Sequence, residues 1–186
     1  MHNSSLEKYY FINSLDTNVI KKLQKHTTLI YRNYNEDRLD EIKILKLKSI
    51  CKKNQIRFVL SNQFKLSIKL NLDGAYIPSF NNEYKHLSYN LPKDFVLIGS
   101  AHNLKEILIK QTQNVDLIFI SPIYKTKKKK FFLDTYRFIN LKKLTRKKVI
   151  ALGGINYSNF KKLRFTDCYG IASISSIKSY YNGKSN

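Results

Sequence analysis

The sequence lacks several features that would place the chain in other protein classes. Its 186 residues contain no uninterrupted apolar run of about 18 residues, so we expect no transmembrane helix. The amino terminus does not show the basic-then-apolar pattern of a signal peptide. The two cysteines, Cys51 and Cys168, have no partner spacing that suits a metal site. We therefore expect two free thiols in a cytoplasmic protein.

Acidic residues are also scarce. The chain has 13 Asp and Glu against 34 Lys and Arg, and its formal net charge is +21. A basic surface is the electrostatic footprint of nucleic-acid binding proteins. Here the lysines are scattered along the chain rather than gathered in one arm, which favours compositional drift instead. Under either interpretation, a positive surface would attract anionic substrates such as diphosphates.

The sequence shows no internal repeat and no linker rich in proline, glycine or serine. Its length is enough for one domain with a sizeable core and too short for two large ones. We therefore expect residues 1–186 to form a single domain.

Short apolar runs alternate with longer amphipathic segments, which is typical of parallel βαβ units. We expect eight strands, over residues 9–12, 28–31, 56–60, 74–77, 95–99, 117–121, 149–152 and 169–173. Eight such units match a closed (β/α)₈ TIM barrel, and an open doubly wound sheet is the second choice. The chain is shorter than the ~200 residues at the lower end for barrels. We therefore expect a compact barrel whose final helix is short or missing, with at most residues 176–181 available for it.

The segments between the strands are mostly helical in pattern. We expect helices over residues 19–25, 37–53, 63–70, 104–111, 135–144 and 158–163. In the longest of these, Leu39, Ile42, Leu45 and Ile50 form the expected apolar side. Residues 81–90 show little periodicity and are expected to be irregular.

In a barrel of this kind the active site lies at the carboxyl ends of the strands. The residues that follow the apolar runs are polar, rich in hydroxyls and amides, and almost free of carboxylates. They are Asn13, Ser14, Arg32, Asn33, Tyr34, Ser61, Asn62, Gln63, Pro78, Ser79, Ser100, His102, Asn103, Ser121, Pro122, Gly153, Gly154, Ser173, Ser175 and Ser176. This set suits an anion and a heteroaromatic ring. It offers neither a carboxylate pair for glycoside hydrolysis nor a Ser-His-Asp triad.

The apolar run at residues 149–152 stops at two glycines, Gly153 and Gly154, and a helix-like segment follows. Glycine lets the backbone approach a ligand closely, and a helix amino terminus offers N–H groups to a phosphate. We expect a phosphate cradle here, with a tight turn that holds no ligand as the alternative.

Several segments at the strand ends resemble the thiamine phosphate synthase and thiazole tautomerase family, whose members are (β/α)₈ barrels. They occur in the family's order and spacing over nearly the whole chain. The segments are LSN at 60–62, LDGAYI at 72–77, SAHNLKE at 100–106, SPIYKT at 121–126, IALGGIN at 150–156, YGIA at 169–172 and SSI at 175–177.

The resemblance implies a transferase that joins an aminopyrimidine methyl diphosphate to a thiazole phosphate and releases diphosphate. By position, it also assigns roles to individual residues. Arg32, Asn62, Thr126 and Lys129 match residues that hold the diphosphate and pyrimidine. Ser100 matches the serine that faces the reacting centre, so Ser100 and Lys129 are the expected catalytic residues. Gly154, Ser175 and Ser176 match the cradle for the thiazole phosphate.

The chain departs from the family at the metal site. Gln63 and Asn81 stand where the family places two Mg²⁺-binding aspartates. Neutral amide oxygens give a hard cation no compensating charge, so we expect Mg²⁺ to be held weakly if at all. The lysine-rich segment at 125–130 could partly replace the charge of the ion. Tyr76 stands where the family has a histidine, which disfavours the tautomerase activity.

We expect a divergent thiamine phosphate synthase-like enzyme whose partners are phosphorylated small molecules rather than membranes. A degenerate barrel of the same family, which binds a phosphorylated ligand without turnover, is the second hypothesis. Nucleic-acid binding is a distant third. For His102, at the start of an expected helix, capping and packing compete with a role in the site. The oligomeric state is left open.

Overall fold

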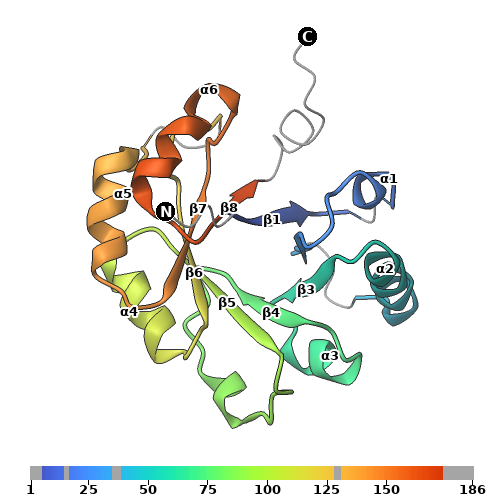
Figure 1. Ribbon diagram of the computed structural model, residues 1–186. Coiled ribbons are helices and arrows are strands. Elements are labelled where there is room, and N and C mark those ends of the chain that lie inside the picture. The colour runs from blue at the N-terminus through green and yellow to red at the C-terminus, as the bar shows by residue number, and fades with distance from the viewer. Residues whose placement is uncertain (1–5, 15–16, 35–38, 128–130, 174–186) are drawn as a thin grey trace.

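A computed structural model describes residues 6–14, 17–34, 39–127 and 131–173. Eight parallel strands close into a barrel in sequential order, with β8 pairing back onto β1 (Figure 1). The strands are β1 (Glu7–Ile12), β2 (Thr28–Tyr31), β3 (Arg57–Ser61), β4 (Gly74–Ile77), β5 (Val96–Ala101), β6 (Leu117–Ile120), β7 (Lys148–Leu152) and β8 (Gly170–Ser173). The expected (β/α)₈ barrel is confirmed, with each strand within two residues of its predicted bounds. The segment expected to hold a short final helix lies outside the described residues.

Helices cover the outside of the barrel between most pairs of strands (Figure 1). They are α1 (Thr17–Lys21), α2 (Glu41–Lys53), α3 (Phe64–Lys69), α4 (Leu104–Thr112), α5 (Asp134–Lys143) and α6 (Tyr157–Phe160), with the 3₁₀ turns η1 (Lys85–Ser88) and η2 (Lys161–Thr166). The connection from β4 to β5 contains η1 but no α-helix. The expected irregular segment at residues 81–90 is therefore confirmed, and no α-helix covers the barrel between β4 and β5.

The prediction for the long second helix was wrong in its start and in part of its apolar side, since Leu39 and Ile50 pack against the core but Ile42 and Leu45 are exposed. Helix α2 begins at Glu41 because the Asp40 side chain caps it, accepting from the N–H groups of the next turn. Ile42 is 79% exposed, whereas the buried stripe consists of Ile44, Leu47 and Cys51. Both stripes have nearly helical spacing, and only docking against the barrel selects between them.

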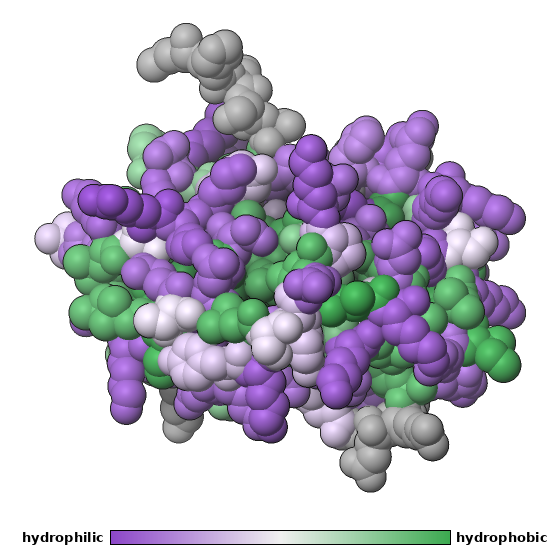
Figure 2. Space-filling view, turned by 90° about the horizontal axis from the view of Figure 1, so that it is seen from below, coloured by the Kyte–Doolittle hydropathy of each residue, from purple (hydrophilic) through white to green (hydrophobic). Residues whose placement is uncertain are grey.

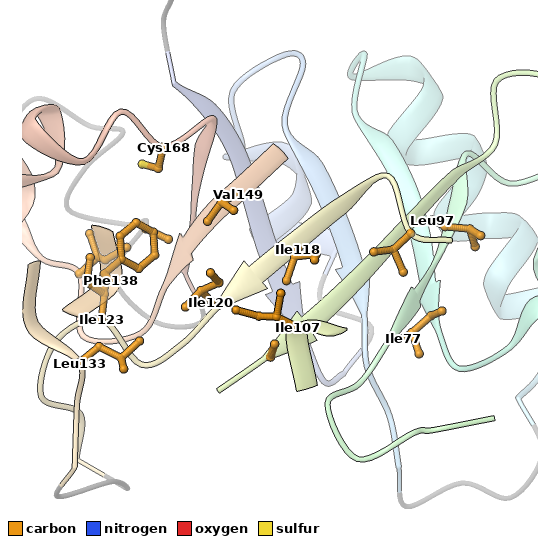
Figure 3. Packing of buried hydrophobic residues seen from close by; sticks show 14 of the residues in the cluster. Ile77, Leu97, Ile107, Ile118, Ile120, Ile123, Leu133, Phe138, Val149 and Cys168 are labelled. Carbon is orange, nitrogen blue, oxygen red and sulfur yellow. The ribbon is translucent and has the colours of Figure 1, made fainter. Parts of the chain in front are cut away.

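Two apolar layers surround the strands. Outside the barrel, Ile107 of α4 and Phe138 of α5 pack with outward-facing strand residues such as Ile118 and Val149 (Figure 3). Inside it, four aromatic rings dominate the packing: Tyr9, Phe11, Tyr76 and Phe119. Their rings meet edge to face, with centroids 5.1 Å apart for Tyr9 and Phe119 and 5.3 Å for Phe11 and Tyr76. The barrel therefore has a filled centre rather than a pore.

The face seen from below Figure 1 is mostly hydrophilic, with smaller groups of hydrophobic residues between the polar side chains (Figure 2). Within the described part of the chain, every helix is too short or too polar to cross a bilayer. The two cysteines, Cys51 and Cys168, are buried and unpaired, and burial raises the pKa of the Cys51 thiol to about 12.

Candidate active site at the barrel mouth

The carboxyl ends of the strands carry a layer of polar side chains above the aromatic interior. Side chains alternate along a strand, so a residue two positions after an interior residue also points inward. Five interior residues are followed in this way by polar ones, which are Asn13, Arg32, Ser61, Ser100 and Ser121. The mouth is therefore lined by hydroxyls, an amide and one guanidinium group, as the residues after the apolar runs predicted.

Arg32 supplies positive charge at this mouth. Its main-chain N–H continues the ladder of β2 by donating to the carbonyl oxygen of Ile12 at 2.8 Å. The guanidinium carbon lies 5.3 Å from the centre of the Phe11 ring and 5.8 Å from that of Tyr34. The Nε atom donates to Asn13 Oδ1 at 3.3 Å. The aromatic faces and Asn13 thus orient a permanently charged group over the interior rings.

Ser100 is paired with Tyr76 from the neighbouring strand. The Tyr76 phenol donates to Ser100 Oγ at 2.8 Å, and both side chains are at least 96% buried. Burial raises the pKa of Tyr76 far above its ordinary value, although the bond to Ser100 and the charge of Arg32 oppose this. The phenol therefore stays protonated and acts as a hydrogen-bond donor.

A second tyrosine contacts a second serine at the mouth. Tyr34, just after β2, places its hydroxyl 3.2 Å from Ser61 Oγ. Burial raises the pKa of Tyr34, while Ser61 and Arg32 oppose the shift. Its ring also meets the ring of Phe80 edge to face at 5.5 Å. Because Phe80 is 66% exposed, these two rings form an aromatic rim at the opening.

His102 links the ends of three strands. Its Nδ1 lies 2.8 Å from the carbonyl oxygen of Ser121, and its Nε2 lies 3.4 Å from Ser79 Oγ. A carbonyl oxygen can only accept, so Nδ1 carries the proton in the neutral ring and Nε2 faces Ser79 as an acceptor. The main-chain N–H of His102 donates to Glu106, while Asn103 caps α4. His102 therefore joins the polar layer, and helix capping falls to its neighbour.

At one of the two expected metal positions, the Asn81 amide is engaged with a neighbouring side chain and with the backbone. Asn81 Nδ2 donates to Asn62 Oδ1, and Asn81 Oδ1 accepts from the N–H of Glu83 at 2.7 Å. Gln63 stands at the start of α3 without capping it. No group of three His, Cys, Asp or Glu side chains suitable for a metal occurs among residues 6–14, 17–34, 39–127 and 131–173. These donors do not fit an ordinary Mg²⁺ site, which prefers carboxylates.

The glycine turn after β7 has both residues at positive φ, 96° for Gly153 and 70° for Gly154. A Cβ on Gly153 would lie 2.8 Å from Pro122 Cβ, and one on Gly154 would lie 2.5 Å from the carbonyl oxygen of Lys125. The loop after β6 thus packs directly on this turn, which is by itself sufficient reason for glycine. The phosphate cradle remains a prediction.

The helix that follows the glycine turn contributes less to such a cradle than expected. Helix α6 has only four residues. The Asn156 side chain accepts from the N–H groups of Ser158 and Asn159, and the Asn159 side chain accepts in return from the N–H of Asn156. These N–H groups therefore already have partners within the chain.

The structure places the expected site residues in two groups. Arg32, Asn62 and Ser100 lie at the ends of β2, β3 and β5, while Thr126 lies beside Gly153, within 3.7 Å of where its Cβ would be. Three expected residues, Lys129, Ser175 and Ser176, lie outside the described residues.

The serine pairs at the mouth were not predicted, although the residues that form them appeared among those after the apolar runs. Counting two positions on from each interior residue would have identified Ser61 and Ser100 as inward-facing. Lys110 was missed altogether. It is a fully buried lysine in α4 whose ammonium reaches the connection after β4, and its sequence context gives no sign of this.

A family model described as thiamine monophosphate synthase matches residues 12–177. The chain belongs to this family. A thiamine-phosphate synthase 1 from Streptococcus pneumoniae serotype 4 is 25% identical over 194 residues, which cover 95% of this chain and 92% of that protein. The thiamine biosynthesis bifunctional protein ThiED from Geobacter sulfurreducens is 21% identical over 187 residues. That match covers 96% of this chain but only 38% of the longer protein.

Solved structures support the same fold. A thiamine phosphate pyrophosphorylase from Pyrococcus furiosus superimposes with a TM-score of 0.71 at 15% identity, over 90% of this chain and 85% of that one. The citrate synthase SbnG gives a TM-score of 0.68 at 11% identity, over 96% and 90% of the two chains. At these identities the likeness shows the barrel fold alone, and proteins of different activity share it.

Proposed function

We propose that this protein is a thiamine phosphate synthase-like transferase. It would join an aminopyrimidine methyl diphosphate to a thiazole phosphate with release of diphosphate. The observation that supports this most is the mouth of the barrel, where Arg32 stands on aromatic rings beside buried hydroxyls. Loss of diphosphate from the pyrimidine needs positively charged protein groups beside the leaving diphosphate and a flat pocket for the ring. The relatives' names and the family match point to the same reaction.

In this proposal the chain's own side chains hold the leaving diphosphate. Arg32 is fixed by Phe11, Tyr34 and Asn13, so little reorganisation is needed when charge develops. Thr126 and Lys129 would approach from the loop after β6. Gly153 and Gly154, with Ser175 and Ser176, would hold the thiazole phosphate. Because the amides at 63 and 81 offer no carboxylate, protein cations would supply most of the neutralising charge.

The direct test is to incubate the purified protein with both substrates and to measure thiamine phosphate, with and without Mg²⁺. We expect product in both conditions. Absence of product in both conditions would exclude synthase activity. Calorimetric binding of the thiazole phosphate without turnover would then support the second hypothesis, a non-catalytic barrel that binds a phosphorylated ligand.

We also infer that residues 1–186 form one domain and that the protein is cytoplasmic. The described residues close a single barrel, and two unpaired buried thiols suit a reducing compartment.

A further inference from the structure

Three buried serines at the barrel mouth each contact a ring that comes from the preceding strand or directly follows it. The contacts are Tyr34 with Ser61, Tyr76 with Ser100, and His102 with Ser121. Among them, only the Tyr76–Ser100 contact joins two residues of regular strands, β4 and β5. It is also the shortest of the three side-chain contacts, at 2.8 Å.

The direction of this hydrogen bond determines what Ser100 can do. Tyr76 is the donor, so one lone pair of Ser100 Oγ is occupied. A hydroxyl that accepts from one partner still carries its own hydrogen, which it can donate to another. Because burial keeps the Tyr76 phenol protonated, this arrangement persists over the whole physiological pH range.

The Tyr76 ring is held in place by its neighbours. Its centroid lies 5.3 Å from that of Phe11 and 5.8 Å from that of Phe119. These rings fill the barrel below the mouth and leave the phenol little freedom to move away from Ser100. The floor beneath Ser100 is thus formed by aromatic rings, which suits a neutral heteroaromatic ring better than a phosphate group.

We propose that Tyr76 is a positioning residue that holds the Ser100 hydroxyl as a donor to an acceptor nitrogen of the aminopyrimidine ring. This role rests on the proposed function, because it needs an aminopyrimidine to be the ligand. Tyr76 does not itself touch the ring that binds; it sets the orientation of the group that does. The role depends on the tyrosine hydroxyl at position 76.

The test is calorimetric binding of the aminopyrimidine methyl diphosphate, without thiazole phosphate, to Tyr76→Phe, Ser100→Ala and the double variant. The phenylalanine keeps the ring contacts and removes only the hydroxyl. We expect Tyr76→Phe to weaken aminopyrimidine binding roughly 2- to 13-fold, the range for one net hydrogen bond, and to leave thiazole phosphate binding unchanged. In the Ser100→Ala background, Tyr76→Phe should have no further effect.

Tyr9→Phe is the matched control. Tyr9 is another buried tyrosine of the same aromatic cluster, but its charged neighbours Glu7 and Arg57 lie at the amino-terminal ends of their strands. Equal weakening by Tyr9→Phe and Tyr76→Phe, or equal weakening by Tyr76→Phe with and without Ser100, would overturn the positioning role. Unchanged binding in Tyr76→Phe would do the same. If the wild-type protein bound thiazole phosphate but no aminopyrimidine, the proposed substrate would be wrong and this role would fall with it.

Discussion

The ammonium of Lys110 donates a hydrogen bond of 2.6 Å to the main-chain carbonyl oxygen of Asn81. The same nitrogen donates to Gln113 Oε1 at 2.8 Å. The side chain reaches this position by crossing Gly99, where a Cβ would lie 2.9 Å from Lys110 Cδ. A lysine of α4 thus fastens the connection between β4 and β5, where the fold has no α-helix of its own. Since Asn81 in turn donates to Asn62, hydrogen bonds connect Lys110 to the mouth of the barrel.

Replacing Lys110 with methionine should destabilise the protein. Methionine has a similar volume but leaves Gln113 Oε1 without its donor in the buried interior. We expect a loss of roughly 1–3 kcal/mol in the free energy of unfolding, measured by urea denaturation. Lys105→Met, at an exposed position of the same helix, is the control and should change stability little. Equal effects of the two variants would contradict a structural role for Lys110.

The stability of the protein should depend on pH through Lys110. Burial lowers the pKa of Lys110 from 10.5 to about 8, with the charge of Glu106 opposing the shift. Between these two values the unfolded chain binds more protons than the folded one, so the free energy of unfolding should rise as the pH increases from about 8 to 10.5. The neutral amine keeps two N–H donors, which are enough for the carbonyl oxygen of Asn81 and for Gln113 Oε1. Urea denaturation should show a larger rise in the free energy of unfolding for the wild type than for Lys110→Met over this pH range. A difference between the two proteins that does not change with pH would contradict the prediction.

Diphosphate binding should be weakened even when Arg32 is replaced with lysine. The ammonium group of lysine cannot keep both the ring stacking and the paired donors of a guanidinium group. We expect Arg32→Lys to weaken binding of inorganic diphosphate about tenfold or more, measured by calorimetry. Arg137, an exposed residue of α5, provides a matched control because its guanidinium lies 5.9 Å from the Phe131 ring. Arg137→Lys should bind diphosphate like the wild type.

Diphosphate binding should not require Mg²⁺. We expect the wild type to bind inorganic diphosphate equally well in EDTA and in Mg²⁺. Asn81→Asp adds a carboxylate at the mouth and removes the N–H that Asn62 accepts. It should weaken binding in EDTA by roughly fivefold, about 1 kcal/mol of charge repulsion, and Mg²⁺ should restore part of the loss. Asn90→Asp makes the same charge change on an exposed residue late in the connection between β4 and β5, and it should not affect diphosphate binding. Clearly tighter binding by the wild type in Mg²⁺ would refute the prediction.

Gly154 should tolerate no side chain. Alanine at this position would adopt a left-handed conformation and meet the carbonyl oxygens of Tyr124 and Lys125. We expect Gly154→Ala to lose at least ~1 kcal/mol of stability and to bind the thiazole phosphate poorly. Asn156→Ala should lose a similar amount through its missing cap, yet keep that binding if the glycine turn forms the cradle. Loss of thiazole phosphate binding in both variants would instead implicate the helix end.

The strands were predictable because most are apolar runs buried on both faces, whereas the contacts between side chains were not. Tyr76 is paired in register with Ile98, and its hydroxyl reaches Ser100 two residues further on. That reach depends on the stagger of β4 and β5, which no local pattern reveals. Docking likewise decided between Ile42 and Ile44 in α2. The amides at 63 and 81 were visible in the sequence as substitutions, but the bond between Asn62 and Asn81 depends on the folded loops.

The filled interior also prevents molecules from passing through the barrel. Because Tyr9, Phe11 and Phe119 occupy the centre, nothing can enter or leave through the barrel axis. In the proposed reaction, both substrates, the product and the released diphosphate would share one opening. Diphosphate that has not yet departed would then compete with the next pyrimidine for Arg32. Product inhibition by diphosphate should accordingly be competitive toward the pyrimidine substrate.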